Sequence, residues 1–510
     1  MNGVQILLIV GIGIAVSAVA GRKGFESGMV VVVLAAAASF IPGVPRLELD
    51  SELILALVIP PLLYSGARGA TMSSFAANLR PIISLGVMLV VLTTGALGLI
   101  SSWLLPGLGL AAAFLLGAVL APPDTITTVS RGDEIGLPKR VTSILTGESL
   151  VNDAIALTLF SIALEAVNGH DATWAGGIKE FAFKAGVGLL IGGVLAVAAL
   201  WLRKRLRNPT LETALILLVP FTAYLTAEEL DASGILAVVM ASFSVTANLT
   251  LDPKHQYPGG YRTRLQEEGV WQVLDFLLTT FVFAYIGLQL KFVLTDLADS
   301  DGLVRTLVAA GVLLAAAIVL RLVGVFGLFG RWTLRHRMIH RRADRDPRYR
   351  ERLRQVEERQ RQRGGEPLAP PSMKDTLLVG WTGMRGILTL AAASAIPQTT
   401  ATGVPFPGRD AIQGIALIVT LGTLVIQGTT LGWLARVLKS DHTADRETAE
   451  SMDLLGREII ASMPSTTDAD FDAQRHALAV AVHEHRLDEE TARRMIDAVD
   501  LRQAAERTRD

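Results

Sequence analysis

Apolar stretches long enough to cross a lipid bilayer recur almost from one end of the chain to the other. A helix needs about 20 mostly apolar residues to span the hydrocarbon core. Hydrophobic residues fill 51% of the 510 positions and glycine adds 47 more, well above the usual share in soluble domains. The sequence therefore predicts an all-α, polytopic membrane protein with about thirteen spans, at residues 3–20, 28–44, 52–66, 82–104, 107–122, 141–165, 182–202, 211–228, 233–248, 270–290, 303–330, 376–398 and 410–434.

The distribution of basic residues predicts how these spans are oriented. Loops after odd-numbered spans hold 28 Lys and Arg, whereas loops after even-numbered spans, counted with their edges, hold six. Since Lys and Arg accumulate on the cytoplasmic side, we expect the N-terminus outside, the C-terminus inside, and a location in the cell inner (plasma) membrane. Arg22 and Lys23 follow the first segment and no basic residue precedes it, so we expect a retained span rather than a cleaved leader.

Two polar regions stand out from the membrane part. We expect a transmembrane domain over 1–438, with a basic cytoplasmic loop at 331–375, and a helical cytoplasmic tail over 439–510. The arginines of the basic loop could bind nucleic acid in principle. Beside a membrane span, however, we expect contact with anionic lipid headgroups and no nucleic acid partner.

Residue types that the spans lack argue against several classes of function. The chain has no cysteine, which excludes disulfides and thiolate metal sites. All eight histidines lie outside the predicted spans, which leaves no base or metal cluster for a membrane-embedded enzyme. His483 and His485 in the tail have no further ligands nearby in the sequence. We therefore expect neither an enzyme nor a bound cofactor.

The segment TGESLVNDAIALTLF, residues 146–160, places polar and acidic side chains inside an apolar span. Glu148, Ser149, Asn152 and Asp153 have the spacing of residues on one helix face. A charge near the bilayer centre costs roughly 3 kcal/mol or more, so it is retained mainly where it meets a partner, water or an ion. The carboxylates could be structural, as buried ion pairs, but basic partners within the spans are few. The stripe therefore indicates a cation site.

A second polar segment, LAPPDTITTVSRGDEIG, precedes this stripe. Pro122 and Pro123 remove two helix donors and disfavour helix before them. They could simply end the span at the membrane surface. A helix broken at membrane depth instead exposes carbonyl oxygens and is tolerated where it lines a cavity. Asp124 and Thr125 would then add oxygen ligands of the kind that hard cations such as Na+ prefer.

Only two arginines, Arg321 and Arg385, lie well inside apolar segments. Arg385 stands in LLVGWTGMRGILTLAAASAIP, where Gly383 and Gly386 allow close helix approach or unwinding. It could extend its guanidinium to the membrane surface, but its depth favours a pair with a buried carboxylate. Arg321 has the same two options, and the sequence assigns it no partner.

These motifs resemble the monovalent cation:proton antiporters of the Na+/H+ exchanger group. The likeness rests on GESLVND, the Asp124 segment, GMRG and VIQGTTLGWLA, and it covers roughly residues 5–435. It implies that Asp153 binds both Na+ and the proton, with Asp124 and Ser149 at the same Na+ site. It also implies that Asn152 bridges the unwound helices and that Glu148 forms a buried pair with Arg385. One departure concerns the break, where Pro122 and Pro123 precede Asp124 and Thr125 follows it.

The resemblance further implies a fold and a mechanism. It implies two inverted six-helix repeats, spans one to six and eight to thirteen, with span seven between them. Spans four to six and eleven to thirteen would form a moving core with unwound crossing helices, and the rest would form a scaffold that makes a homodimer. The expected activity is electroneutral exchange of Na+, and of Li+ if the site admits it, for H+. The alternatives are K+/H+ antiport and, from another class, a cation channel, which usually has filter loops instead of an isolated buried acid.

Overall fold

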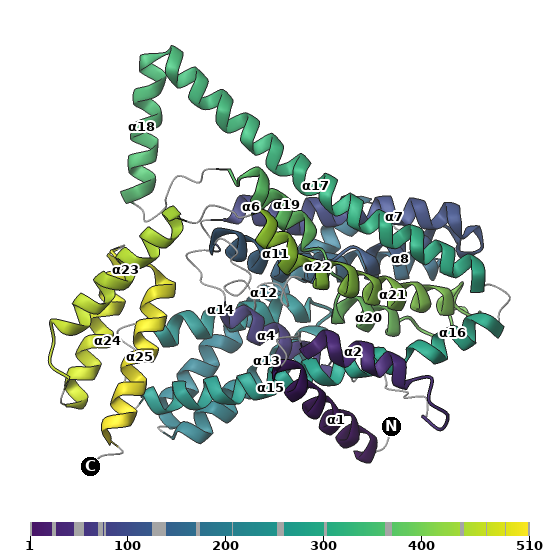
Figure 1. Ribbon diagram of the computed structural model, residues 1–510, viewed down its shortest axis with the longest axis horizontal. Coiled ribbons are helices and arrows are strands. Elements are labelled where there is room, and N and C mark those ends of the chain that lie inside the picture. Colours follow the sequence, from purple (N-terminus) through teal and green to yellow (C-terminus); the bar gives the residue numbers. More distant parts are fainter. Residues whose placement is uncertain are drawn as a thin grey trace.

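We analysed a computed structural model of the chain (Figure 1). The structure describes residues 3–22, 27–44, 56–69, 75, 78–124, 139–169, 174–206, 208–251, 260–299, 303–362, 370–438, 443–465, 467–484 and 486–507.

The helices of the membrane part follow the predicted spans in order. They are α1 (Gly3–Arg22), α2 (Ser27–Ala38), α4 (Ile59–Gly69), α6 (Leu79–Ile83), η1 (Ser84–Leu89), α7 (Val90–Leu104), η2 (Pro106–Leu108), α8 (Gly109–Leu120), α11 (Lys139–Val167), α12 (Trp174–Leu206), α13 (Pro209–Glu229), α14 (Gly234–Leu251), α15 (Gly260–Leu288), α16 (Leu290–Asp299), α17 (Leu303–Arg345), α19 (Met373–Trp381), α20 (Ile387–Ser394), α21 (Arg409–Thr423), η4 (Leu424–Gly428) and α22 (Thr429–Leu438). The polar regions form α18 (Pro347–Gln362), α23 (Thr443–Ala461), α24 (Asp468–His483) and α25 (Glu489–Arg507).

The helix lengths confirm the predicted multi-pass, all-helical architecture. Within the described part of the chain, eight helices are long and apolar enough to cross a membrane, and three shorter apolar helices accompany them. Each of the thirteen predicted spans overlaps one helix or a consecutive set of helices. The count of thirteen itself stays a prediction.

Two predicted segments have a different form in the structure. The region expected as a loop at 331–375 is largely helical, because α17 continues to Arg345 and α18 follows from Pro347. No proline or glycine interrupts α17 between Arg331 and Arg345, so nothing in the sequence ends the helix at the membrane surface. The expected span at 376–398 is two half-helices, α19 and α20, separated by an unwound stretch that contains Gly383 and Gly386.

Two large apolar clusters divide the membrane helices into two groups. The first cluster is built mainly by α1, α2, α4 and α12 to α15, and the second by α7, α8, α11, α17, α20 and α21. Within the second group the backbones of α7 and α8 are in direct contact, because Gly117 has no side chain. A Cβ on Gly117 would clash with the Thr94 carbonyl and lie 2.8 Å from the Gly98 nitrogen. We call the two groups the scaffold and the core. Their membership agrees with the division that the resemblance implies.

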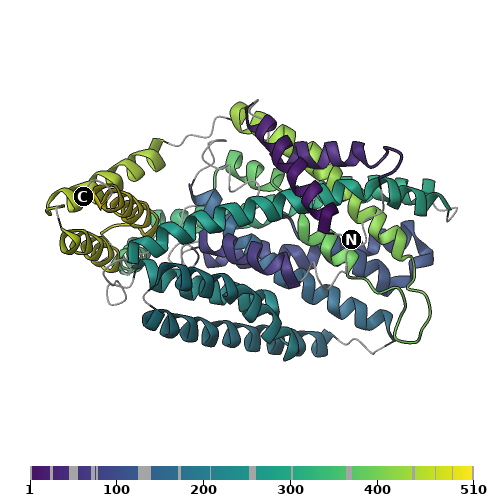
Figure 2. The same cartoon turned by 90° about the horizontal axis from the view of Figure 1, so that it is seen from below.

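The three C-terminal helices form a small bundle of their own at one end of the molecule (Figures 1 and 2). Phe471, Leu478 and Val499 are among its buried residues. The bundle is attached to the scaffold by Asp500, which accepts hydrogen bonds from Arg264 of α15 at 2.7 and 2.8 Å and from Arg475 of α24 at 2.7 Å. Arg493 adds a hydrogen bond to the Arg68 carbonyl of α4 at 3.0 Å. The tail helices therefore contact the scaffold directly.

Candidate cation-binding site

Helix α11 carries the polar stripe that the sequence predicted. The helix is continuous from Lys139 to Val167, and Glu148, Ser149, Asn152 and Asp153 are all buried along it, with exposed fractions of 0 to 9%. Because these residues are spaced i, i+1, i+4 and i+5, they share one face. Apolar residues on other faces of the helix, such as Leu150 and Ala154, are also buried, so the stripe lies inside the helix bundle.

The two interrupted segments meet beside this stripe. Helix α8 ends at Leu120, before Pro122 and Pro123, and the Asp124 backbone N–H donates to the Met384 carbonyl at 2.7 Å. Asn152 donates its side-chain N–H to the Pro123 carbonyl at 2.8 Å. Asn152 therefore ties α11 to the interruption in the α8 segment, and its bridge to the second unwound segment stays a prediction. Thr125 lies outside the described residues.

The Asp124 carboxylate lies in the space that a side chain at Gly386 would fill. A Cβ at Gly386 would clash with Asp124 Oδ2, so only a glycine lets the carboxylate lie over the first residues of α20. Gly386 is the N-cap residue of α20, where unpaired backbone N–H groups and the helix dipole favour negative charge. The geometry therefore places an acid at the start of one half-helix, close to the Asp153 face of α11.

The predicted Glu148–Arg385 pair is wrong, because Glu148 pairs with Arg321. Arg321 Nη2 donates to Glu148 Oε2 at 2.8 Å, and Arg321 Nη1 donates to Glu148 Oε1. Both side chains are buried, at 3% and 0% exposure. Arg321 reaches the stripe from α17, which sequence spacing alone could not reveal since 173 positions separate the partners. This pair neutralises the first acid of the stripe.

Arg385 instead binds backbone carbonyls where the two interrupted segments, the end of α8 with residues 122–124 and the stretch between α19 and α20, meet. We call this place the crossing. Its Nε donates to the Leu120 carbonyl at 2.8 Å and its Nη1 donates to the Gly383 carbonyl. Leu120 ends α8, and Gly383 lies two residues past the end of α19. A cation at a helix C-terminus offsets the negative end of the helix dipole. The guanidinium therefore stabilises the ends of two half-helices that would otherwise point unpaired carbonyls into the membrane.

Asp153 differs from Glu148 in its surroundings. Among the described residues it makes no ion pair, and the charged groups that act on it are the carboxylates of Asp124 and Glu148. Ser149, one turn earlier on the same face, is also buried and carries a hydroxyl oxygen. A buried carboxylate without a protein cation needs a proton or a metal ion to balance its charge. The residues present suit a hard monovalent cation held by carboxylate and hydroxyl oxygens.

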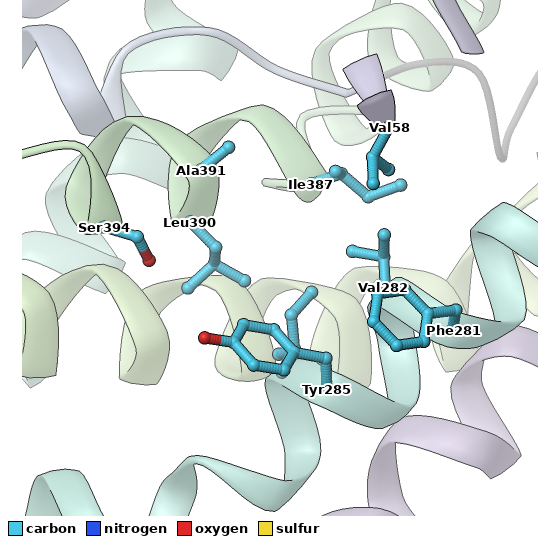
Figure 3. Close-up of a pocket in the computed structure, with 9 residues that line it drawn as sticks. Val58, Phe281, Val282, Tyr285, Ile387, Leu390, Ala391 and Ser394 are labelled. Atoms are coloured by element: carbon cyan, nitrogen blue, oxygen red, sulfur yellow. The ribbon is translucent and has the colours of Figure 1, made fainter. Parts of the chain in front are cut away.

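A small apolar pocket lies between the scaffold and the half-helix that follows the crossing (Figure 3). Phe281 and Tyr285 of α15 face Ile387 and Leu390 of α20 across it. The other lining residues are Val58, Val282, Ile286, Ala391 and Ser394. The lining is mostly apolar, so α15 and α20 face each other across an apolar surface at this point.

The sequence did not single out individual polar residues of the last span. Thr423 and Gln427 are buried and both contact the unwound stretch before α20. The signal for Gln427 was present in the polar letters of VIQGTTLGWLA, and Thr423 stands two residues before that motif in the same apolar segment.

Comparison with known proteins identifies the family of this chain. Residues 3–437 match the family model described as "Sodium/hydrogen exchanger, transmembrane". A Na+/H+ exchanger of Mycobacterium tuberculosis, itself uncharacterized, is 30% identical over 456 residues, which are 85% of this chain and 74% of that protein. A sodium, potassium, lithium and rubidium/H+ antiporter of Bacillus subtilis is 30% identical over 78% of this chain, which spans 55% of that protein's length.

A solved structure supports the fold. The sodium proton antiporter MjNhaP1 of Methanocaldococcus jannaschii aligns with a TM-score of 0.63 over 86% of this chain and 98% of that one, at 17% identity. The family match spans the core, the scaffold and every residue of the polar stripe. The chain belongs to the sodium/hydrogen exchanger family of cation/proton antiporters.

Proposed function

We propose that this protein exchanges Na+ for H+ one for one, with both ions competing for Asp153. The observation that carries the proposal is the contrast between the two buried acids of α11. Glu148 is neutralised by Arg321, whereas Asp153 has no ion-pair partner in the described part of the chain. Burial disfavours a bare carboxylate, so Asp153 holds either a proton or a cation, and loading one releases the other.

The charges of the stripe support an electroneutral cycle. The position before Asp153 is Asn152, whose side chain cannot titrate and donates to the Pro123 carbonyl. Asp153 is then the one group that changes its occupant, and it has the same net charge with Na+ or H+ bound. A membrane potential, worth about 2.3 kcal/mol per charge at 100 mV, would do no net work on this cycle. Asp124 and Ser149 complete the Na+ site with their oxygens.

Alternating access follows from the two helix groups. The crossing belongs to the core, and the pocket between α15 and α20 marks where the core meets the scaffold on an apolar surface. An apolar contact of this kind can slide or separate without breaking ion pairs. Movement of the core against the scaffold would expose Asp153 to one side of the membrane and then to the other, as in transporters built from broken helices.

K+/H+ exchange is the second candidate. The Bacillus subtilis relative is named for sodium, potassium, lithium and rubidium. Ion preference depends on which carbonyls the α8 break exposes.

The remaining parts of the proposal concern the protein in its membrane. We place it in the plasma membrane as a homodimer with the N-terminus outside, the domain at 1–438 in the bilayer and the tail at 439–510 in the cytoplasm. The extension of α17 beyond the span and α18 are rich in arginine, which suits contact with anionic lipid headgroups.

A direct test uses everted membrane vesicles with a pH-sensitive dye. After respiration acidifies the vesicles, adding Na+ should dissipate the pH gradient, and Asp153→Asn vesicles with equal protein content should show no such response. Parallel additions of K+ and Li+ give the ion preference. Equal dissipation by wild-type and Asp153→Asn vesicles would contradict the assignment of Asp153.

A further inference from the structure

The last span changes its helical winding where it passes the unwound stretch. Between α21 and α22, η4 covers Leu424–Gly428 as a π-helical turn. Single π turns inside α-helices are rare and occur mostly at functional sites. Such a turn contains an extra residue, so it changes which side chains face a neighbour.

Gln427 of this turn and Thr423, the residue before it, hold the two ends of the stretch between α19 and α20. Gln427 Nε2 donates to the Trp381 carbonyl at 2.9 Å, where α19 ends. Thr423 Oγ1 accepts from the Arg385 backbone N–H at 3.0 Å, just before α20 begins. Gln427 and Thr423 are 1% and 0% exposed, so water does not compete for these bonds.

A third contact binds the side chain of Trp381 in addition to its carbonyl. The Trp381 indole N–H donates to the Thr430 hydroxyl at 2.9 Å, while the Gly383 backbone N–H shares the Trp381 carbonyl with Gln427 at 2.9 Å. The carbonyl and the indole of Trp381, at the end of α19, are therefore both held by the last span.

The stretch held in this way carries groups that contact the candidate cation site. Met384 accepts from the Asp124 backbone, Arg385 binds the carbonyl that ends α8, and Gly386 supports the Asp124 carboxylate. A displacement of the Trp381 or Arg385 peptide would move these groups together. Electrostatic stabilisation of a bound ion depends steeply on distance in a poorly screened interior, so the ion at Asp153 and Asp124 would sense that displacement.

We propose that Gln427, with Thr423, is a positioning residue that fixes the unwound stretch between α19 and α20 and thereby sets the cation affinity of the transport site. This role deepens the proposed function and rests on it. It differs from a purely structural role because loss of the Gln427 hydrogen bond should change ion affinity and pH dependence, in addition to stability.

The chain offers a matched control on the same helix. Gln413 of α21 donates its side-chain N–H to the Ala393 carbonyl at 3.1 Å. This bond resembles that of Gln427 in chemistry, but it holds the far end of α20, away from the crossing. Methionine has nearly the shape of glutamine and cannot donate, so Gln427→Met and Gln413→Met each remove one bond from a side-chain amide to a backbone carbonyl, at a buried and at a partly buried position respectively.

The test measures the apparent KM for Na+ and the pH of half-maximal exchange in proteoliposomes, alongside thermal unfolding of each purified variant. We expect Gln427→Met to change the KM by at least threefold and to move the pH midpoint, with a smaller change in kcat. Gln413→Met should keep the wild-type KM and midpoint, even if it lowers the unfolding temperature as much.

A second pair of variants keeps the test decisive if Gln427→Met does not fold. Thr423→Val removes the hydroxyl at constant shape and should reproduce the KM change, whereas Thr423→Ser retains the hydroxyl and should restore the wild-type value. Unchanged KM and pH midpoint in Gln427→Met and Thr423→Val, or equal changes in Gln413→Met, would overturn the inference alone. A wild-type protein that moves neither Na+ nor K+ against H+ would overturn the proposed function and this inference with it.

Discussion

The buried Glu148–Arg321 pair allows a quantitative prediction. Glu148 is fully buried and Arg321 is 3% exposed, and the two side chains are joined by two parallel hydrogen bonds. Hydrogen bonds to charged groups contribute about 1.5–3 kcal/mol each. Removing one partner of a buried pair costs roughly 3–5 kcal/mol, because it leaves the other charge uncompensated. Glu148→Gln and Arg321→Met should each therefore lower the free energy of unfolding by about that amount.

The double variant should be more stable than the two single changes predict. Removing both charges together leaves no uncompensated ion, so the coupling energy should be about 2–3 kcal/mol. A double-mutant cycle between Glu148 and Arg385 should give a coupling energy of less than about 1 kcal/mol, because the Arg385 guanidinium binds the carbonyls of Leu120 and Gly383.

Reversible unfolding in mixed micelles, followed by tryptophan fluorescence, measures these free energies for the wild type and each variant. Additivity of Glu148→Gln and Arg321→Met within about 0.5 kcal/mol would show that the two residues do not interact. A larger coupling for Arg385 than for Arg321 would refute the assignment of the partner.

Three further predictions concern the site and the tail. Asp153→Asn should abolish exchange while the protein keeps its elution profile and unfolding temperature, because Asn retains the shape but cannot exchange a proton; a near wild-type rate in proteoliposomes would exclude Asp153. Gly386→Ala should lower the apparent Na+ affinity at least tenfold by displacing the Asp124 carboxylate, whereas Gly432→Ala, where a Cβ meets nothing within 4 Å, should match the wild type. Desolvation and the nearby Asp500 and Glu268 raise the pKa of Asp497 to about 6, against the opposing charges of Arg264 and Arg493. Because the docked tail then binds the Asp497 proton more tightly than the free tail does, docking should strengthen as pH falls from about 7 through 6 towards the ordinary pKa of Asp, about 4. Protection of the α25 amides, measured as the exchange rate relative to the intrinsic rate at each pH, should rise over that range, and an equal rise in Asp497→Asn would exclude Asp497 as the cause.

Sequence reasoning succeeded where a single residue type limits the backbone. Pro122 and Pro123 predicted the end of α8, and the glycines at 383 and 386 predicted that the twelfth span could unwind. The spacing of Glu148 and Asp153 placed both on one face of α11 because a helix has a fixed period. Hydropathy predicted the order of the spans because the thickness of the bilayer fixes how long an apolar spanning segment must be.

Sequence reasoning failed where the outcome depended on how helices rotate and pack against one another. Arg321 and Arg385 are alike in sequence context, and only the packing of α17 against α11 brings Arg321 to Glu148. The helical extension of α17 and the attachment of Asp500 to Arg264 also depend on contacts between distant segments. The contacts of Thr423 and Gln427 depend on the π turn at Leu424–Gly428, and nothing in the sequence of this segment distinguishes a π turn from a continuous α-helix.

One-for-one exchange at a single carboxylate can be tested most directly by measuring the ion gradients at which transport stops. Proteoliposomes are prepared with a pH difference of about one unit, the membrane potential is held at zero, and the Na+ gradient is varied until net flux vanishes. Exchange of one Na+ for one H+ predicts no flux when Na+ is about tenfold more concentrated on the side that is also more acidic, since each tenfold ratio is worth about 1.4 kcal/mol. A balance point near a hundredfold gradient would mean two protons per Na+, and would contradict an account in which Asp153 alone exchanges its ion.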